Sequence, residues 1–423
     1  MKVPMGWMND PNGFSLYEGE YHLFFQYHPY SREWGSMHWG HVKSQDFIRW
    51  EHLPVALAPD QVYDKEGCFS GTAIEDNGKH ILAYTSVYYE DGIEEPDKIR
   101  QTQSIAIGDG ENYTKQENNQ VIDKKLLPEG ASLVDFRDPK IFKSHGSYNM
   151  IVANRDRDGR GQLLKFESAD LKKWQYMGVF YKPEKKLGRM WECPDYFEVD
   201  NRQVVIFSPM QLFKDGKAED AQTVCMQVKF DKETCAMELP EEYQFLDYGT
   251  DLYAPQSTLD ESGRRILTAW LRMPEPVDGK WQGMMCIPRV VEVKENHIYF
   301  RVHPNVQAAY TKEISAPSEA DESGYRLRFS LEDGDKVDVG GYVISRKGDK
   351  ICTDRSCLFG KYPNHRVKFE TPEMKGFEIE VYVNPNQISV FVNDGEAVIT
   401  NAVYDLGKEI ETDVKMRIET LEK

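Results

Sequence analysis

Three carboxylates in this 423-residue chain lie beside proline in motifs typical of turns next to strands. Asp10 lies in WMNDPNG, Asp138 in FRDPK and Glu192 in WECPD. Hydrolysis of a glycosidic bond uses a pair of carboxyl groups that flank the bond. The three acids together therefore indicate glycoside hydrolysis, although each motif alone is also typical of an ordinary turn or strand end.

The residues next to the acids favour different protonation states. Asparagines beside Asp10 are hydrogen-bond donors, which favours an ionised nucleophile. Glu192 lies between Trp191 and Cys193, an apolar setting that favours a protonated acid. Asp138 has an arginine beside it and is suited to hold substrate hydroxyls and to offset positive charge in the transition state.

Five segments with alternating apolar residues follow one another at intervals of about 60 residues. Each begins at a turn residue, and in chain order these are Gly19, Gly78, Gly146, Asn201 and Gly263. Alternation after a glycine or asparagine predicts a β-hairpin. A unit of this size that is repeated five times predicts a five-bladed β-propeller.

The unusual polar motifs occupy nearly the same place in every repeat. Asp10, Ser70, Asp138, Glu192 and Tyr253 each lie eight to ten residues before the turn of their repeat. The innermost strand of each propeller blade lines one central axis, so equivalent positions converge at one opening. We therefore expect these five residues to contribute to a single site.

The chain changes character after the fifth repeat. We predict an all-β protein in which residues 1–302 form the propeller, residues 303–324 a linker and residues 325–423 a β-sandwich. The last segment has alternating runs and a hairpin turn at Asn393. Because it has no cluster of acids, we assign it a packing role, and it is a candidate face for a homodimer.

Composition argues against several kinds of partner. The formal net charge of −18 disfavours nucleic acid and anionic membrane surfaces. No apolar run reaches the roughly 18 residues of a membrane span, and the N-terminal residues have no apolar signal-peptide core. Seven scattered cysteines without a paired pattern are typical of reduced thiols, so we predict a cytoplasmic protein.

The sequence has no clear motif for a metal or a cofactor. His38 and His41 form an HxxH pair in MHWGH, but no third ligand is spaced with them. A glycine-rich phosphate loop and a Ser-His-Asp signature are both missing. We therefore predict that the protein needs neither a metal nor a cofactor, and that its partner is a small carbohydrate.

Six motifs, in order along the chain, resemble those of glycoside hydrolase family 32: WMNDPNG, HWGH, FSGT, FRDP, ECPD and DLYAPQ. The resemblance runs through most of residues 7–300. It implies a five-bladed propeller followed by a β-sandwich, as the repeats also indicate. It further implies a retaining, metal-independent β-fructofuranosidase. The family contains invertases, sucrose-6-phosphate hydrolases, inulinases and levanases, and the segment around HWGH looks most like bacterial members of the first two groups.

The same resemblance implies roles for individual residues. Asp10 matches the nucleophile that attacks C2 of the fructosyl unit, Glu192 matches the general acid/base, and Asp138 matches the residue that stabilises the transition state. The positions that match fructose-binding residues are Asn9, Gln26, Trp39, Phe69, Ser70 and Arg137. Tyr253 and Trp270 match aromatic positions around the pocket.

The substrate stays open among sucrose, sucrose-6-phosphate and short fructans. A phosphate would need basic residues at the rim, for which the loop candidates are Lys98, Arg100, Arg155, Arg157, Arg160 and Arg189. Alternatives on the same scaffold are a fructosyltransferase, an inverting arabinanase-type glycosidase and a catalytically silent carbohydrate-binding propeller. The WMNDPNG motif argues against the inverting enzyme, and the intact acids argue against a silent protein.

Overall fold

The structure is a computed structural model that describes residues 1–181, 187–214, 217–218, 222–231, 236–238, 240 and 242–422. Strands predominate in these ranges, and the two α-helices among them are short: α1 (Pro304–Ala309) and α2 (Ser356–Phe359). Within the same ranges, none of the helices has the length and apolar character needed to cross a membrane. The all-β prediction is confirmed.

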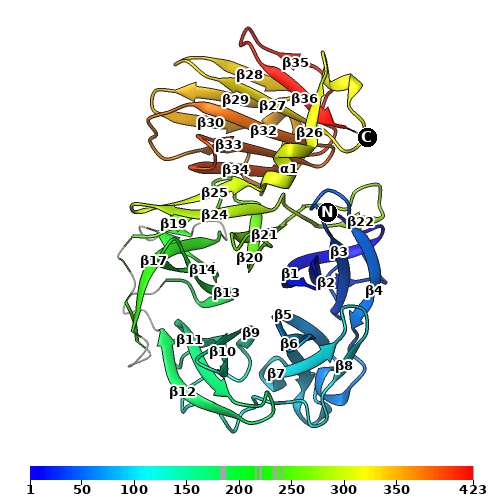
Figure 1. The fold of residues 1–423 in the computed structure, drawn as a ribbon, viewed down its shortest axis with the longest axis vertical. Helices are drawn as coiled ribbons and strands as arrows, with labels where there is room; N and C mark the ends of the chain where they lie inside the picture. The colour runs from blue at the N-terminus through cyan, green and yellow to red at the C-terminus, as the bar shows by residue number, and fades with distance from the viewer. Residues whose placement is uncertain are drawn as a thin grey trace.

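In the N-terminal part of the described chain, five sheets surround a common axis (Figure 1). Their innermost strands are β1 (Gly6–Tyr17), β5 (Gly67–Asp76), β9 (Phe136–Ser144), β13 (Met190–Val199) and β20 (Leu252–Leu259). Each innermost strand contacts the innermost strand of both neighbouring sheets, and β20 contacts β1. These contacts close the sheets into a ring.

Every innermost strand pairs antiparallel with the strand that follows it. These second strands are β2 (Glu20–His28), β6 (Lys79–Tyr89), β10 (Ser147–Arg155), β14 (Arg202–Met210) and β21 (Arg265–Leu271). The hairpin turns contain the glycines and the asparagine that the sequence pattern singles out, so the five predicted hairpins are confirmed.

Outer strands complete the sheets. They are β3 (His38–Ser44), β4 (Glu51–Leu57), β7 (Ile99–Gly108), β8 (Tyr113–Lys115), β11 (Gly161–Ser168), β12 (Trp174–Tyr181), β17 (Val224–Asp231), β18 (Ala236–Glu238), β19 (Gln244–Phe245), β23 (Met284–Met285), β24 (Arg289–Lys294) and β25 (His297–Val302). A short strand from the end of the ring, β22 (Trp281–Gln282), pairs parallel with β1. The first sheet is therefore built from both ends of the ring segment.

Each innermost strand is irregular where the predicted site residues lie. Pairing with the second strand is interrupted directly after Met8, Phe69, Arg137, Glu192 and Tyr253. In three strands the interruption begins with a left-handed residue followed by proline: Asp138 (φ 63°), Cys193 (φ 49°) and Ala254 (φ 52°). Proline has no N–H to donate to a ladder, which suits a bulge. Because a bulge disturbs the alternation of side chains, consecutive residues can both face the axis.

A set of buried polar residues follows the interruptions and joins innermost strands to one another. Its members are Asn12, Thr72, Lys140, Asp195 and Gln256. Lys140 Nζ lies 2.7 Å from Asp195 Oδ1, and Thr72 Oγ1 donates to the Pro139 carbonyl at 2.8 Å. Gln256 Nε2 donates to the Gly71 carbonyl at 2.5 Å. Since buried polar groups need partners, these contacts hold the sheets of the ring in register with one another.

The C-terminal part of the described chain forms two further sheets beside the ring (Figure 1). The six-stranded sheet has the order β26 (Tyr310–Glu313), β36 (Arg417–Leu421), β27 (Tyr325–Ser330), β32 (Glu378–Asn384), β33 (Gln387–Val392) and β34 (Ala397–Ala402). The five-stranded sheet has the order β31 (Lys368–Glu370), β30 (Lys350–Asp354), β29 (Tyr342–Lys347), β28 (Lys336–Val339) and β35 (Ile410–Glu411). Leu327, Ile344 and Val390 belong to the apolar core of this unit.

The segment predicted as a linker has structure of its own. It contains α1 and β26, and β26 pairs with β36 at the end of the chain. This segment therefore contributes a strand to the C-terminal unit. The division into residues 1–302, 303–324 and 325–423 stays a prediction. The hairpin predicted at Asn393 is confirmed, because β33 and β34 pair across it.

Three histidines are buried between the first two sheets. His22 Nδ1 and His41 Nε2 lie 2.9 Å apart, and His80 Nε2 lies 2.8 Å from Ser15 Oγ. Burial lowers the pKa of His22 to about 4, of His41 to about 2 and of His80 to about 3. The folded protein therefore keeps these rings neutral at pH values where an unfolded chain protonates them.

We expect the free energy of unfolding to decrease as the pH is lowered from about 7 to about 5. The unfolded chain gains protons near pH 6.5, whereas the folded chain gains them only near pH 4 and below. Each histidine contributes up to about 1.4 kcal/mol per pH unit in this window. Urea titrations at a series of pH values measure the slope. His80→Gln should flatten it, and an unchanged slope in that variant would contradict the assignment.

Candidate active site

The interrupted strands bring the three predicted acids together at the axis. Asp10 lies on β1, Asp138 on β9 and Glu192 on β13. Cys193, which follows Glu192 on β13, contacts both Asp10 and Asp138. Its backbone N–H donates to Asp138 Oδ2 at 2.9 Å, and its Sγ lies 3.5 Å from Asp10 Oδ2. Side chains from three sheets therefore meet in one cluster.

Asp10 is a partly exposed carboxyl group with donors from two sheets. Ser70 Oγ donates to Asp10 Oδ2 at 2.7 Å. Burial raises the pKa of Asp10 above its ordinary value, and the charge of Glu192 acts in the same direction. Hydrogen bonds from Ser70 and Asn9 oppose this rise and favour the ionised form. The donors expected from neighbouring asparagine are thus supplemented by a serine from the next sheet.

Asp138 is more deeply buried, with 5% of its surface exposed. Burial, together with the nearby charges of Glu192 and Asp10, raises the pKa of Asp138 to about 7. Arg137 and the backbone N–H of Cys193 oppose the rise. The Asp138 carboxyl group therefore gains or loses its proton near neutral pH.

Glu192 has a partner on each carboxyl oxygen. Arg137 donates to Oε1 from Nη2 at 2.8 Å and from Nε at 3.2 Å, and the Tyr253 hydroxyl donates to Oε2 at 2.7 Å. The apolar setting predicted for Glu192 is wrong, because Trp191 is buried in the core and stacks on Phe207. An arginine and a tyrosine from the two neighbouring sheets hold this carboxyl group in one orientation.

The register of the bulges refines the alignment of the repeats. Phe69, Arg137, Glu192 and Tyr253 are each the last paired residue before the interruption. Ser70, Asp138, Cys193 and Ala254 are the next residues, inside the interruption. Glu192 is therefore equivalent to Arg137, although its distance from the hairpin turn aligned it with Asp138. Sequence reasoning missed Cys193 as a contact of two acids, and its place directly before proline, shared with Asp10 and Asp138, is the signal that could have found it.

Two of the predicted binding residues lie where the first two sheets meet. Trp39 is fully buried, and its Nε1 donates to the Phe69 carbonyl at 3.1 Å. Gln26 is also buried, and its Nε2 donates to the Cys68 carbonyl at 3.0 Å. These two side chains hold the backbone of β5 next to the site. Their direct contact with a sugar stays a prediction.

Aromatic residues surround the cluster. Trp270 packs edge-on against Trp7, with ring centroids 5.9 Å apart, and Trp7 Nε1 donates to Asn9 Oδ1 at 2.7 Å. Phe69 is partly exposed and packs edge-on against Trp34, with centroids 5.7 Å apart. Trp34 is 57% exposed and was not predicted from the sequence. Exposed aromatic faces next to the acids are suited to contact a sugar ring.

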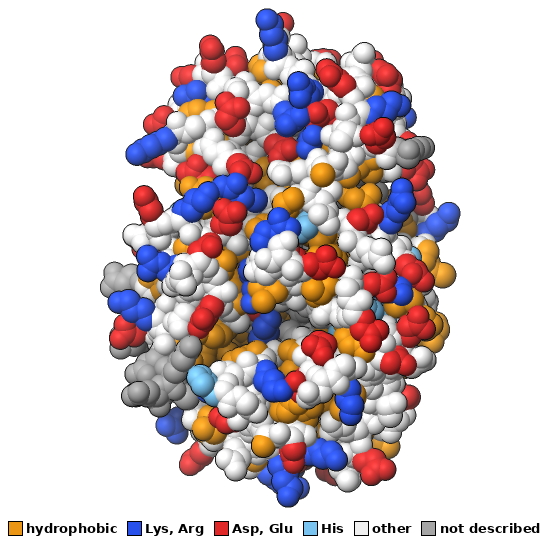
Figure 2. Space-filling view, in the orientation of Figure 1, with side chains coloured by type: hydrophobic (Ala, Val, Ile, Leu, Met, Phe, Trp, Pro, Cys, Tyr) orange, Lys and Arg blue, Asp and Glu red, His pale blue; other side chains and the backbone are white. Residues whose placement is uncertain are grey.

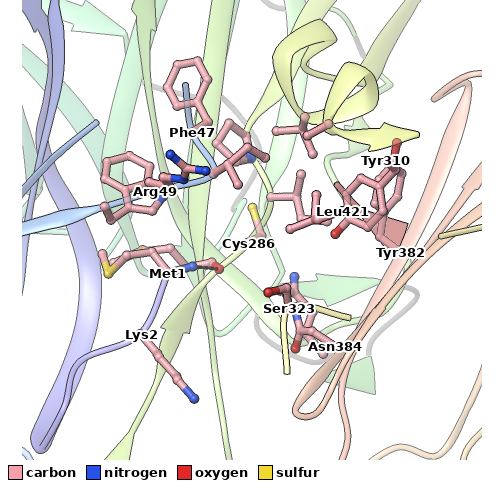
Figure 3. Close-up of a pocket in the computed structure, with 18 of the residues that line it drawn as sticks. Met1, Lys2, Phe47, Arg49, Cys286, Tyr310, Ser323, Tyr382, Asn384 and Leu421 are labelled. Atoms are coloured by element: carbon pink, nitrogen blue, oxygen red, sulfur yellow. Dashed lines mark hydrogen bonds between the residues drawn. The ribbon is translucent and has the colours of Figure 1, made fainter. Parts of the chain in front are cut away.

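The surface charges and a cavity beside the ring lie apart from the three acids. Lys, Arg, Asp and Glu side chains are interspersed over the face in Figure 2. A cavity of about 650 Å³ lies between the ring and the C-terminal unit, and Phe47, Arg49, Tyr310 and Tyr382 are among its lining residues (Figure 3). None of the three acids lines it. Among the described residues, no group of three or more His, Cys, Asp or Glu side chains is placed to hold a metal ion.

Comparisons with known proteins agree with this geometry. Residues 1–304 match the N-terminal domain of glycosyl hydrolases family 32. A sucrose-6-phosphate hydrolase from Escherichia coli is 31% identical over 434 residues, which cover 96% of this chain and 89% of that protein. The structure of a sucrose-6-phosphate hydrolase from Lactobacillus gasseri aligns with a TM-score of 0.87 at 25% identity, covering 100% of this chain and 93% of the other. A Bombyx mori β-fructofuranosidase in complex with sucrose aligns with a TM-score of 0.86 at 27% identity, with the same coverage.

A ring of sheets with a cluster of carboxyl groups on its axis, joined to a second all-β unit, defines a glycoside hydrolase of the propeller type. The chain belongs to glycosyl hydrolases family 32. The family predicted from the six motifs is confirmed.

The hydrogen bond from Ser70 to Asp10 generates a prediction about pH dependence. Because this bond favours the ionised form of Asp10, Ser70→Ala should raise the pKa of Asp10 and move the acidic limb of kcat/KM to higher pH. A hydrogen bond to a charged group is worth about 1.5 kcal/mol or more, so a shift of about one pH unit is expected. Ser70→Thr keeps the hydroxyl and serves as the control. An acidic limb that stays in place in Ser70→Ala would contradict the role.

Proposed function

We propose that this protein hydrolyses β-fructofuranosides of the sucrose type and releases fructose with retention of configuration. The observation that carries the proposal is the meeting of Asp10, Asp138 and Glu192 on one axis, each with donors from a neighbouring sheet. The relatives named as sucrose-6-phosphate hydrolases and the sucrose complex of the Bombyx mori enzyme support the same substrate class.

In the proposed first step, Glu192 gives a proton to the glycosidic oxygen while a carboxylate oxygen of Asp10 attacks C2 of the fructosyl unit. The bond between C2 and the glycosidic oxygen breaks, an ester bond to Asp10 forms, and the alcohol leaves. In the second step, Glu192 takes a proton from water, and the water oxygen attacks C2. Fructose is released and the Asp10 carboxylate is regenerated.

The remaining polar residues have supporting roles in this proposal. Asp138 accepts hydrogen bonds from fructose hydroxyls, and its negative charge offsets the oxocarbenium character of the transition state. Arg137 orients Glu192 and balances the charge of the cluster. Asn9, Gln26, Trp39, Phe69, Ser70, Tyr253 and Trp270 are proposed to shape the fructose pocket.

Preference for a phosphate on the substrate depends on basic residues at the rim. Three loop candidates are already paired: Arg100 with Glu90, Arg155 with Asp135 and Arg160 with Asp156. Lys98, Arg157 and Arg189 are therefore the better candidates for a phosphate contact. The ratio of kcat/KM for sucrose-6-phosphate to that for sucrose, measured on the wild type, decides between a phosphate-directed and a neutral-sugar enzyme.

We also propose a cytoplasmic location for the enzyme. All cysteines in the described ranges are free thiols, which supports a reducing compartment, and Cys235 lies outside those ranges. A homodimer through the C-terminal unit stays a prediction.

Fructose release from sucrose and from sucrose-6-phosphate tests the proposed function. We expect release by the wild type and a loss of about 10²- to 10⁴-fold in kcat in Glu192→Ala, because a general acid/base contributes that much. Asp10→Asn should lose at least as much. Glu198→Ala, which changes an exposed glutamate on the same strand, is the control and should keep its activity. Near-normal turnover in Glu192→Ala or Asp10→Asn would refute that residue's role, and no release by the wild type would refute the function.

A further inference from the structure

We propose that the C-terminal unit positions Glu192 for catalysis through a buried ion pair between Arg355 and Asp251. This inference rests on the proposed role of Glu192 as the acid/base. It makes Arg355 and Asp251 positioning residues that act through Tyr253, and it gives the C-terminal unit a part in the reaction besides packing.

The ion pair is bidentate and spans the two units. Arg355 lies between β30 and α2, and Asp251 lies directly before β20, the innermost strand of the fifth sheet. Arg355 Nη1 lies 2.5 Å from Asp251 Oδ2, and Arg355 Nη2 lies 3.1 Å from Oδ1. The backbone N–H of Ala402 donates to Asp251 Oδ2 at 2.9 Å. The carboxylate that precedes β20 is therefore held by donors from the C-terminal unit.

Arg355 has little freedom to adopt another position. The residue is 1% exposed, and its guanidinium lies 3.8 Å from the ring centroid of Phe359 and 5.1 Å from that of Phe369. Its Nη2 also donates to the Arg366 carbonyl at 2.9 Å. A guanidinium fixed on this many sides transmits the position of the C-terminal unit to Asp251.

Two residues separate this ion pair from the catalytic cluster. Asp251 is followed by Leu252 and then Tyr253, whose hydroxyl donates to Glu192 Oε2 at 2.7 Å. The Asp251 carbonyl accepts from the Arg272 backbone N–H at 2.9 Å, and the Arg272 guanidinium lies 5.1 Å from the Tyr253 ring centroid. The start of β20 is thus fixed on one side by Arg355 and on the other by contacts that reach Tyr253.

Tyr253 is suited to pass this constraint on to Glu192. Burial and the charge of Glu192 raise the pKa of Tyr253 well above its ordinary value, so its hydroxyl keeps the proton that it donates. Hydrogen bonds weaken steeply as distance and angle depart from their optimum. A small shift of β20 therefore changes how Glu192 is oriented toward the glycosidic oxygen, while the proposed pocket residues on β1, β2, β3 and β5 keep their places.

A second buried ion pair provides a matched comparison. Arg289 Nη2 lies 2.7 Å from Asp247 Oδ2 and 2.8 Å from Thr400 Oγ1, and the Thr400 backbone N–H donates to Asp247 Oδ1 at 2.8 Å. Arg289 is fully buried, and although Arg289 and Asp247 both belong to the ring, their contacts with Thr400 tie the pair to the C-terminal unit. It lacks a direct route to the cluster, since Asp247 lies six residues before Tyr253 and outside β20. The Arg289–Asp247 pair therefore has a structural role only.

The test is a double-mutant cycle read out as kcat and KM for fructose release from sucrose or sucrose-6-phosphate, whichever the wild type hydrolyses. Arg355→Met should lower kcat about tenfold and leave KM within about twofold, because positioning of Glu192 is lost while the proposed pocket residues on β1, β2, β3 and β5 stay in place. In the Tyr253→Phe background the same change should lower kcat less than about twofold, because the route is already broken. Arg289→Met should lower the melting temperature but keep kcat.

Several results would overturn the proposal. They are an unchanged kcat in Arg355→Met, an equal loss of kcat with and without Tyr253→Phe, and an equal loss in Arg289→Met. If Arg355→Met does not fold, as judged by circular dichroism, Arg355→Lys replaces it, because lysine keeps the charge but not the two-point contact. Glu192→Ala separates a failure of this proposal from a failure of the proposed function. If Glu192→Ala keeps its turnover, the acid/base role of Glu192 is contradicted. If Glu192→Ala is inactive while Arg355→Met is unimpaired, only the positioning role of Arg355 is contradicted.

Discussion

The site depends on holding three carboxyl groups close together on a largely buried axis. Burial and the repulsion of neighbouring charges oppose the ionisation of Asp10 and Asp138, so these groups need donors close by. In this protein each acid has at least one donor from a sheet other than its own. Ser70 of the second sheet serves Asp10 of the first, and Cys193 of the fourth serves Asp138 of the third. Glu192 takes its donors from the third and fifth sheets. The cluster therefore exists only when the ring is closed.

This dependence explains two features of the innermost strands. The bulges before proline turn consecutive residues toward the axis, which a regular strand cannot do. They place Asp138, Cys193 and Ala254 in a left-handed conformation that costs roughly 1–3 kcal/mol for each residue. Just beyond the bulges, buried contacts such as Lys140 with Asp195 hold the sheets together and make this strain tolerable. The C-terminal unit also contacts the start of β20, because Arg355 forms an ion pair with Asp251.

Much of the fold was predictable because its signals are local. The five hairpins follow from alternation after a turn residue, and the three acids follow from motifs in which a carboxylate lies beside proline. The family follows from the same motifs. Local patterns also explain the all-β class, since strand periodicity recurs along the whole chain.

The errors and omissions concern contacts between distant residues. Counting back from the turns aligned Glu192 with Asp138, because a count does not show where a bulge adds a residue to the strand. The neighbouring Trp191 predicts an apolar setting for Glu192, but neighbours along a strand face opposite sides, and the side-chain contacts of Glu192 come from Arg137 and Tyr253. The pairing of β26 with β36 joins segments about a hundred residues apart, and no local pattern in the predicted linker predicts this pairing.

The most direct test of the central claim is to locate the covalent intermediate. Glu192→Ala is mixed with a fructosyl donor that has a good leaving group, such as fructosyl fluoride, then quenched in acid and digested for mass spectrometry. Loss of the acid/base slows hydrolysis of the intermediate more than its formation from such a donor. A fructosyl group on Asp10, in the peptide that contains WMNDPNG, is the expected result. A fructosyl group on another residue, or fructose formed with no adduct at any time, would contradict the proposed arrangement of nucleophile and acid/base.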